Sequence, residues 1–385
     1  MEKENNPRAA DRGLASRGFF LADDLSGALD AAAGFHRAGR RVTVALAPDA
    51  WGDDPEAMAG CTTESRNLAP AAAASAVTAA IAEGRRRGAA LVYKKIDSTL
   101  RGPVAAELGA LLAALPEARV LFCPANPAAG RTVRAGVLRV RGVPVAETEF
   151  ARDPVSPVRE SAIRALLGPI ASERVVIPDA ETEADLAAAV AAMDAAGGPW
   201  VAVGSGALAR PVAGRITAGA ARPVASDRDL APGPVLMICG SAHAGNRAQA
   251  AALTCRRGVP ACEVRVRDPE PAIEAATWAA RQAGAVTLIL EGARAEPAAA
   301  LAAMAFAATR VATQTGARRI FVTGGETAFA VCGTLGVRAL DFRAEIEPGL
   351  GLARAGERML AVKPGGFGDD DTWVRAFDRL RGNGD

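Results

Sequence analysis

The sequence predicts an α/β protein made of two three-layer α/β domains, each with a mostly parallel sheet, and a cleft between the domains. The chain has 385 residues, which is enough for two or three domains. Half of the residues are hydrophobic but only 4% are aromatic, so Ala, Val and Leu must fill the cores. Short apolar runs alternate along the chain with longer segments of helical periodicity, a pattern typical of parallel sheets flanked by helices.

The first half of the chain carries one series of these alternations. Predicted strands are 18–25, 41–47, a run beginning at Leu91, 119–122, 174–178 and 200–203. Predicted helices are 25–38, 70–87, 104–115, 161–167 and a segment ending at Ala196. Residues 61–66 predict a polar loop, and the alternating Val residues of 128–145 predict a loop and a hairpin.

A domain boundary is predicted in the Pro-rich, charged segment Pro223–Pro234. We expect residues 1–17 to be frayed, a first domain over 18–225 and a second over 226–385. In the second domain the predicted strands are 235–239, 262–266, 286–290, 319–323, an extended segment over 339–346, and 359–363. The predicted helices are a segment after Cys239, 271–283, 297–315 and 328–336.

Composition excludes several classes of function. The net charge is only +2 and no run of like charge exceeds Arg85–Arg87, which argues against nucleic acid or membrane-surface partners. The six Cys form no CxxC pair and there are only two His, so neither a zinc site nor a disulfide framework is expected. The polar N-terminus lacks an apolar signal region and no apolar run is long enough to span a membrane. We therefore expect a soluble, cytoplasmic protein.

The stretch Leu91–Pro103 (LVYKKIDSTLRGP) is the most informative. Its apolar start predicts a buried strand, which is followed by a polar turn and then a helix. Ligands of open α/β sheets lie just outside the carboxyl ends of the strands. A turn there with Lys95, Asp97, Ser98 and Arg101 is suited to a small hydroxylated anion. A solvated loop, in which Asp97 or Ser98 caps the helix, explains the same composition equally well.

Charged residues also follow two other strands. Asp23 and Asp24 end the first one, where a carboxylate can bind a sugar hydroxyl or accept its proton, although we expect at least one of the two to cap the next helix. Arg66 lies with Glu64 in a polar loop and is suited to clamp a carboxylate, although a lone Arg is more often solvated.

The second half contains glycine-rich turns between strands and helices. Gly324, Gly325, Glu326 and Thr327 follow one strand, where glycine permits close approach to a phosphate and the helix N-terminus offers free N–H groups. A plain turn with a Thr cap is equally compatible. The turn 363–368, with Gly365 and Gly366, follows another strand and either lies against a nucleotide base or phosphate or is a plain loop ahead of the last helix. The turn 240–243 also lies between a strand and a helix, and a lone His such as His243 is more often a capping or packing residue than a catalyst. The loose GxGxxA of 204–209 is too late in its sheet for a dinucleotide fingerprint, and no Walker A, GxSxG or HExxH motif occurs.

Taken together, the segments form a recognisable series. They are ADDLSGALDAAAGF, TTESR, KKIDSTLRGPVAAEL, PANPAAGRTVRAGVLRVRGVPVAET, GSAHAGNRAQ, GGETAFAVCGTLGV and AVKPGGFGDDDTW, in this order. In these segments the chain resembles the four-carbon acid sugar kinase family, from about Gly18 to Trp373. Each segment alone is weakly diagnostic, but all of them in this order are specific.

The resemblance implies an acid-sugar-binding N-terminal domain, a nucleotide-binding C-terminal domain, and catalysis between them. It implies ATP-dependent phosphorylation of a terminal hydroxyl of a compound such as threonate or erythronate, with ATP and Mg²⁺ as cofactors and no metal site built from the protein's own residues. The implied substrate-side residues are Asp23, Asp24, Arg66, Lys95, Asp97, Ser98 and Arg101, with Asp97 or Asp24 as the base. The implied nucleotide-side residues are Ser241, Gly324, Gly325, Glu326, Thr327, Gly365 and Gly366. The oligomeric state is left open, a homo-oligomer included.

Two departures from the family pattern bear on the substrate. His243 replaces a hydroxyl residue near the implied nucleotide site, and Val137 replaces a His that is expected to contact the sugar acid. Two other functions stay open at this point. One is a non-catalytic protein that binds a sugar acid and a nucleotide, and the other is a NAD(P)-dependent dehydrogenase on a similar scaffold.

Overall fold

The computed structural model describes residues 18–52, 54, 56–216, 233–240, 244–291 and 296–382. Contacts within the chain divide it into two compact units, Met1–Arg222 and Pro223–Asp385. The predicted boundary between residues 225 and 226 lies in the segment 217–232, outside the described residues.

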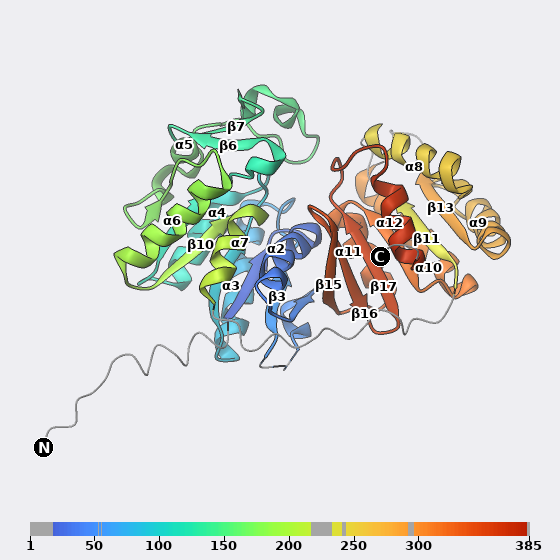
Figure 1. The fold of residues 1–385 in the computed structure, drawn as a ribbon, viewed down its shortest axis with the longest axis horizontal. Coiled ribbons are helices and arrows are strands. Elements are labelled where there is room, and N and C mark those ends of the chain that lie inside the picture. The colour runs from blue at the N-terminus through green and yellow to red at the C-terminus, as the bar shows by residue number, and fades with distance from the viewer. Residues whose placement is uncertain are drawn as a thin grey trace, which may run out of the picture. The chain divides into compact units, whose positions relative to one another are not determined.

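The first unit is built on a parallel sheet (Figure 1). Its strands are β1 (Gly18–Ala22), β2 (Val42–Ala45), β3 (Met58–Thr62), β4 (Ala90–Lys95), β5 (Arg119–Cys123), β9 (Val175–Val176) and β10 (Trp200–Gly204). They lie in the order β2-β3-β1-β4-β10-β5-β9, and every neighbouring pair is parallel. The carboxyl ends of all these strands therefore lie along one edge, and the predicted parallel sheet is confirmed.

Helices cover both faces of this sheet. Helix α2 (Leu25–Arg37) packs on α7 (Gly206–Arg215), which packs on α6 (Glu183–Ala196), while α3 (Pro70–Arg86) packs on α4 (Val104–Ala114). The strand order explains this division. Crossovers are right-handed, so helices that carry the chain in opposite directions along a sheet lie on opposite faces. The connections through α2 and α6 run toward the β2 edge, whereas those through α3 and α4 run toward the β9 edge.

A small antiparallel sheet of β6 (Arg131–Arg134), β7 (Val137–Val140) and β8 (Val143–Pro144) follows β5. It confirms the predicted hairpin. The short helix α5 (Ile163–Leu167) comes next, and Val137 at the start of β7 pairs with Ala162 just before this helix.

The core of the first unit contains aromatic rings at its centre and small residues where helices approach. Phe20 stacks on Phe35 with ring centroids 5.2 Å apart, and Phe35 meets Tyr93 edge to face. Where α2 crosses α7, a side chain on Gly34 would lie within 3.3 Å of the backbone and Cβ of Ala209. Few aromatic residues suffice because the Ala- and Gly-rich helices pack closely on the sheet.

The second unit has a mixed sheet (Figure 1). Its strands are β11 (Val235–Cys239), β12 (Ala261–Val264), β13 (Ala285–Leu290), β14 (Arg319–Thr323), β15 (Ala339–Glu347), β16 (Leu350–Ala355) and β17 (Arg358–Lys363). They follow the order β12-β13-β11-β14-β17-β16-β15. The first five strands in this order, β12, β13, β11, β14 and β17, are parallel to one another. Strand β16 is antiparallel to both of its neighbours, β17 and β15.

Helices again cover both faces. Helices α8 (Ala244–Arg257) and α12 (Thr372–Arg381) pack together, and α10 (Pro297–Thr315) packs on α9 (Glu270–Ala283) and α11 (Gly325–Thr334). Under the α8 and α12 pair lies a core cluster that includes Leu253, Phe321, Trp373 and Phe377. The rings of Phe321 and Trp373 meet edge to face with centroids 5.0 Å apart.

The structure corrects three local predictions. Residues 61–66 do not form a loop throughout, because β3 includes Cys61 and Thr62. Strand β16 was not predicted, since Gly351 and the polar Arg354 weaken its hydrophobic pattern. Helix α11 begins at Gly325, so that Gly325–Thr327 form its first turn rather than a turn before it.

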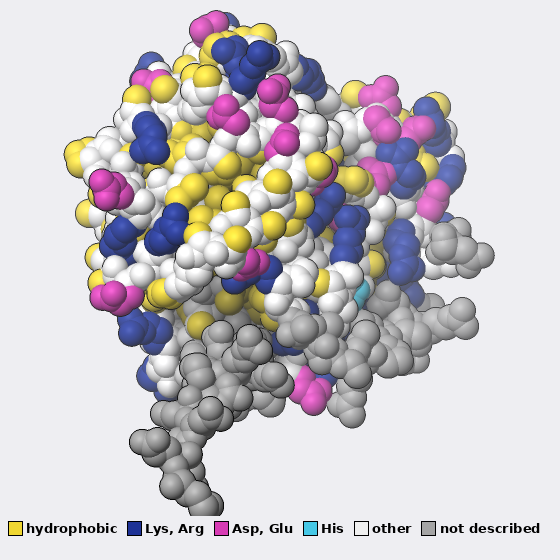
Figure 2. Space-filling view, turned by 60° about the vertical axis from the view of Figure 1, so that its left-hand side comes forward, with side chains coloured by type: hydrophobic (Ala, Val, Ile, Leu, Met, Phe, Trp, Pro, Cys, Tyr) yellow, Lys and Arg dark blue, Asp and Glu magenta, His cyan; other side chains and the backbone are white. Residues whose placement is uncertain are grey.

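Basic and acidic side chains are interspersed on the face of the molecule shown in Figure 2. This agrees with the net charge of +2. Among the helices of the described residues, none is long and apolar enough to cross a membrane.

We predict that Gly84→Ala destabilises the protein although alanine is the better helix former. A Cβ atom at Gly84, inside α3, would overlap the ring of the fully buried Phe19. Overpacking of this kind costs about 1–3 kcal/mol. The matched control is Gly214→Ala inside α7, where a Cβ meets nothing within 4 Å and a gain of about 0.5–1 kcal/mol is expected. Urea denaturation of both variants checks this, and a stabilised Gly84→Ala variant would contradict it.

Candidate functional site

The carboxyl ends of β1, β3 and β4 bring the predicted substrate-side residues together. These three strands are neighbours and parallel, so Asp23 and Asp24, Arg66, and the segment Lys95–Arg101 follow the same edge of the sheet. The chain leaves β1 into α2 on one face and leaves β4 into α4 on the other. In α/β sheets, ligands bind where the chain diverges in this way between two adjacent strands.

Arg66 joins the ends of β1 and β3 through its guanidinium group. Its Nε donates to Oδ2 of Asp23 at 2.8 Å, and its Nη2 donates to Oδ1 of Asp23 at 2.9 Å and to Oδ1 of Asp24 at 2.6 Å. Asp24 also caps α2, accepting from the backbone N–H of Gly27 at 2.8 Å. The prediction that at least one of the two aspartates caps the next helix is thus confirmed. Asp24 forms an ion pair with Arg66 as well as the cap.

The turn after β4 is buried and held by its own side chains. Asp97 and Ser98 are only 7% and 8% exposed. Arg101 forms a bidentate pair with Asp97 at 2.9 and 3.0 Å and reaches Asp153 at 3.2 Å. Helix α4 has Pro103 at its N-cap position and no side-chain cap. The interpretation of this turn as a solvated capping loop is therefore wrong.

A buried polar network, which sequence reasoning did not find, lies beneath this edge. Nζ of Lys94 lies 2.9 Å from Glu107 of α4, and Glu107 also accepts a hydrogen bond from Ser65. All three side chains are at most 3% exposed. Beside it, Lys95 donates to the carbonyl of Ile96 at 3.0 Å and lies 3.8 Å from Asp30 of α2. The network fixes the loop before Arg66 to the start of α4.

Strained backbone marks the same edge. Glu64 and Leu100 have φ angles of 46° and 63°, in the left-handed region that non-glycine residues avoid. Gly102 has φ 95°, and a Cβ there would lie 2.8 Å from the carbonyl oxygen of Arg66. Strain of this kind persists only where the surroundings enforce it, and it gathers at functional sites.

Burial and the arginines set the ionisation of the carboxylates. Burial acts to raise the pKa of Asp97, but the charges of Arg101 and Arg66 outweigh it and hold that pKa well below its usual range. The pKa of Asp23 is likewise lowered, because Arg66 outweighs the effect of burial. Burial raises the pKa of Glu64 to about 8, and the charge of Asp24 adds to the effect. The edge therefore combines ionised aspartates with one carboxyl group that is largely neutral at pH 7.

A second convergence of strand ends lies in the second unit. Strands β11 and β14 are parallel neighbours, and the chain leaves them into α8 and α11 on opposite faces. Gly240 and Gly324 stand at these two strand ends. Gly324 has φ 91°, and a Cβ on Gly240 would overlap the hydroxyl of Thr327 in the first turn of α11. Thr327 thus touches the neighbouring strand end and does not cap its helix.

Lys363, at the end of β17, organises the glycine-rich loop that follows it. Its Nζ donates to the carbonyls of Pro364, Gly365 and Phe367 at 3.2, 2.8 and 2.6 Å. Burial lowers the pKa of Lys363 to about 8. Gly365 and Gly366 therefore lie in a loop of fixed shape beside β14. Ser241 and His243 lie outside the described residues.

Comparison with known proteins identifies both units. Residues 19–172 match a family described as the sugar-binding N-terminal domain, and residues 236–373 match one described as the nucleotide-binding C-terminal domain. D-threonate kinase of Bordetella bronchiseptica is 36% identical over 94% of this chain and 96% of that protein. D-threonate kinase of Cupriavidus necator is 34% identical, and 3-oxo-tetronate kinase of Pseudomonas savastanoi 30%, each over 94% of this chain and 97% of the relative.

The chain belongs to the four-carbon acid sugar kinase family. It is a sugar-acid kinase, an enzyme that takes a nucleotide substrate. Solved structures agree at the level of the fold. A Salmonella typhimurium protein aligns with a TM-score of 0.74 at 24% identity over 93% of this chain and 98% of that one. A Haemophilus influenzae protein aligns with a TM-score of 0.68 at 19% identity over 94% of this chain and all of that one.

Family membership decides between the functions left open by the sequence. A dehydrogenase is excluded, and the structure shows what its apparent GxGxxA motif does. Ser205 caps α7, and a side chain on Gly206 would overlap Asp30 of α2. These residues serve helix packing in the acid sugar kinase.

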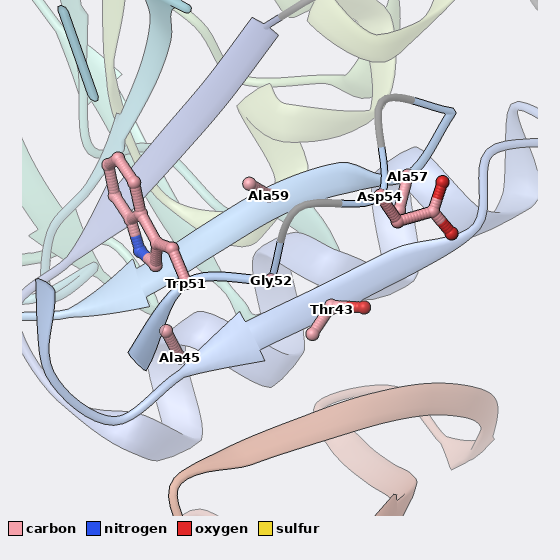
Figure 3. A pocket seen from close by; sticks show the side chains of 7 residues that line it. All are labelled: Thr43, Ala45, Trp51, Gly52, Asp54, Ala57 and Ala59. Carbon is pink, nitrogen blue, oxygen red and sulfur yellow. The ribbon is translucent and has the colours of Figure 1, made fainter. Parts of the chain in front are cut away.

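An open hollow of about 620 Å³ beside the small antiparallel sheet is lined by Val140, Arg141, Val143, Glu147, Thr148, Glu149 and Arg152. The cavity in Figure 3, lined by Thr43, Trp51, Ala59 and neighbouring residues, has a volume of about 20 Å³, room for about one water molecule. Within the described ranges, no group of three or more His, Cys, Asp or Glu side chains is arranged to hold a metal ion.

We predict that Glu64 makes the stability of this acid sugar kinase pH-dependent. Its pKa of about 8 exceeds the ordinary Glu value of 4.5, so between these values the unfolded chain releases a proton that the folded protein keeps. The contribution is complete below pH 4.5 and is lost as the pH rises to 8. Glu64→Gln should therefore gain stability relative to the wild type between pH 5 and 8.5, as measured by urea denaturation. An identical pH dependence in both proteins would refute the shifted pKa.

Proposed function

We propose that this enzyme transfers the γ-phosphoryl group of ATP, bound with Mg²⁺, to the terminal hydroxyl of a four-carbon sugar acid of the threonate type. One observation carries the substrate class. The edge formed by β1, β3 and β4 gathers oriented cations and carboxylates in a chain that is 36% identical to a D-threonate kinase over nearly its whole length. Such an edge suits a ligand that has both a carboxylate and several hydroxyls.

Phosphoryl transfer needs positioned reactants and charge neutralisation more than covalent catalysis. Asp97 is our candidate for orienting the attacking hydroxyl and accepting its proton, because it is ionised and its geometry is fixed by Arg101. Asp24 is the alternative. The oxygens of both carboxylates already accept hydrogen bonds, those of Asp24 from Gly27, Ser26 and Arg66 and those of Asp97 from Thr99 and Arg101. Arg66, Lys95, Ser98 and Arg101 would hold the rest of the sugar acid, and Asp23 would keep Arg66 in place.

The nucleotide would lie at the carboxyl ends of β11 and β14. The N-terminus of α11 offers backbone N–H groups from Gly325 and Glu326, and a Cβ on Gly324 would approach only Thr327, at 3.6 Å. Ser241, Gly365 and Gly366 would line the same site. Mg²⁺ is usually held by substrate phosphates, water and one or two carboxylates. Glu326, in the first turn of α11, would supply a carboxylate. The bound ion would neutralise phosphate charge. The predicted cleft between the domains stays a prediction.

A screen of substrates tests this function. ADP release is measured over three- to six-carbon sugar acids, with D-threonate, erythronate and 3-oxo-tetronate among them. We expect the highest kcat/KM with a four-carbon acid and no turnover with the corresponding neutral sugar alcohol. Preference for the sugar alcohol would overturn the assignment of an acid substrate.

We predict that Asp97→Asn lowers kcat by about a hundredfold to ten-thousandfold, the usual contribution of a positioned acid–base group. ATP binding should be nearly unchanged, because Asp97 lies in the first unit. Asp153→Asn is the matched control, since it removes one hydrogen bond from the same Arg101 and leaves the bidentate pair intact. Steady-state kinetics and calorimetric ATP binding measure both effects. Wild-type turnover in Asp97→Asn would remove Asp97 from the mechanism.

A further inference from the structure

Helix α8 carries a buried stripe that turns from apolar to polar at one end. Leu253 and Ala250 are buried in the core of the second unit, and one turn earlier the stripe continues with Gln249 and Asn246. Asn246 is 1% exposed and Gln249 is 4% exposed. Because α8 follows β11, its first turn lies toward the carboxyl ends of the strands, where Gly240 and Gly324 stand.

These two amides contain buried polar atoms without partners. Within the described part of the chain, neither the Nδ2 nor the Oδ1 atom of Asn246 has a hydrogen-bond partner, and Oε1 of Gln249 also has none. Leaving such atoms unpaired is costly, and native proteins rarely do so without a functional reason. The set therefore lacks acceptors for the two N–H groups of Nδ2 and one donor for each of the two carbonyl oxygens.

The surroundings indicate which ligand could supply these partners. Nε2 of Gln249 donates to the carbonyl of Phe367 at 3.4 Å, and Lys363 donates to the same carbonyl. The unpaired amides thus adjoin the glycine-rich loop assigned above to the nucleotide. A fully ionised phosphate offers acceptors only, so it cannot satisfy a carbonyl oxygen. The nucleoside part offers both kinds of group, through the amino group and ring nitrogens of adenine and through the ribose hydroxyls.

We infer that Asn246 and Gln249 bind the nucleoside part of the nucleotide through their side-chain amides. The inference rests on the proposed use of ATP by this unit. Amides of Asn and Gln pair well with an adenine edge, as donor and acceptor together. Asn246 is the principal contact, because both polar atoms of its side-chain amide are unpaired. Gln249 adds one acceptor, Oε1, and its Nε2 is hydrogen-bonded to the glycine-rich loop.

The experiment measures binding in the absence of the sugar acid. Calorimetry compares ATP, ITP, 2′-deoxy-ATP, 3′-deoxy-ATP and inorganic tripolyphosphate on the wild type and on Asn246→Leu. Leucine has a similar size and lacks the unpaired atoms, so the thermal midpoint should stay the same or rise. The Kd for ATP should rise about tenfold to a hundredfold, the range expected for one bidentate base contact. Binding of tripolyphosphate should not change.

The ATP analogues distinguish recognition of the base from recognition of the ribose. If the base is recognised, ITP binds more weakly than ATP to the wild type and the difference disappears in Asn246→Leu. If the ribose is recognised, one of the deoxy analogues behaves in this way. The matched control is Thr287→Val, which removes another unpaired, fully buried hydroxyl, from β13, and should leave every Kd unchanged.

Three outcomes would overturn the inference. They are an unchanged Kd for ATP in Asn246→Leu, an equal loss for ATP and tripolyphosphate, and wild-type affinities that are the same for ATP and all three analogues. The last comparison needs no variant and holds even if Asn246→Leu does not fold. A wild type that binds none of the triphosphates would instead contradict the proposed function.

Discussion

The bidentate pair between Arg66 and Asp23 is the interaction on which the first site depends. It joins the end of β3 to the end of β1, and the same guanidinium reaches Asp24, which caps α2. A planar guanidinium group that is hydrogen-bonded through both Nε and Nη2 has little rotational freedom left, so it fixes the distance between the two strand ends. Burial makes this pair sensitive to the loss of either partner, because an unpaired buried charge is costly.

On the proposed function, each unit would place its ligand at a strand edge. In each, two parallel neighbours send the chain to helices on opposite faces, and the residues suited to chemistry follow those strands. The first unit uses charged side chains at this place, and the second uses glycines and helix N-termini. The difference suits the proposed ligands, since a sugar acid requires directed side-chain donors whereas phosphates are bound well by backbone N–H groups.

Much of this arrangement could be predicted from the sequence. The apolar run before Lys94 and the Asp pair after β1 indicate strand ends, and parallel strands bring such ends together. The role of Glu107 could not be predicted, since a Glu in the first turn of a helix looks like a favourable surface residue. Its burial against Lys94 follows from the tertiary packing of α4 beneath the site. Strand β3 was missed because four of its five residues, Ala59–Thr62, are small and give a weak hydrophobic pattern. Gly60 is required there because any side chain would overlap the ring of Phe20.

The ion pairs in the first site limit how strongly its arginines can attract an anion by charge alone. Arg66 and Arg101 are already paired with aspartates, so their net attraction for a carboxylate is small. What the pairs provide is orientation. The hydrogen bonds of Arg66 to Asp23 and Asp24 use Nε and Nη2, and Nη1 carries two further donors in a direction that the aspartates fix. A near-neutral Glu64 avoids adding a third negative charge beside them. On the proposed function, such a site would select its ligand by geometry more than by charge, and oriented binding of the hydroxyl is what phosphoryl transfer requires.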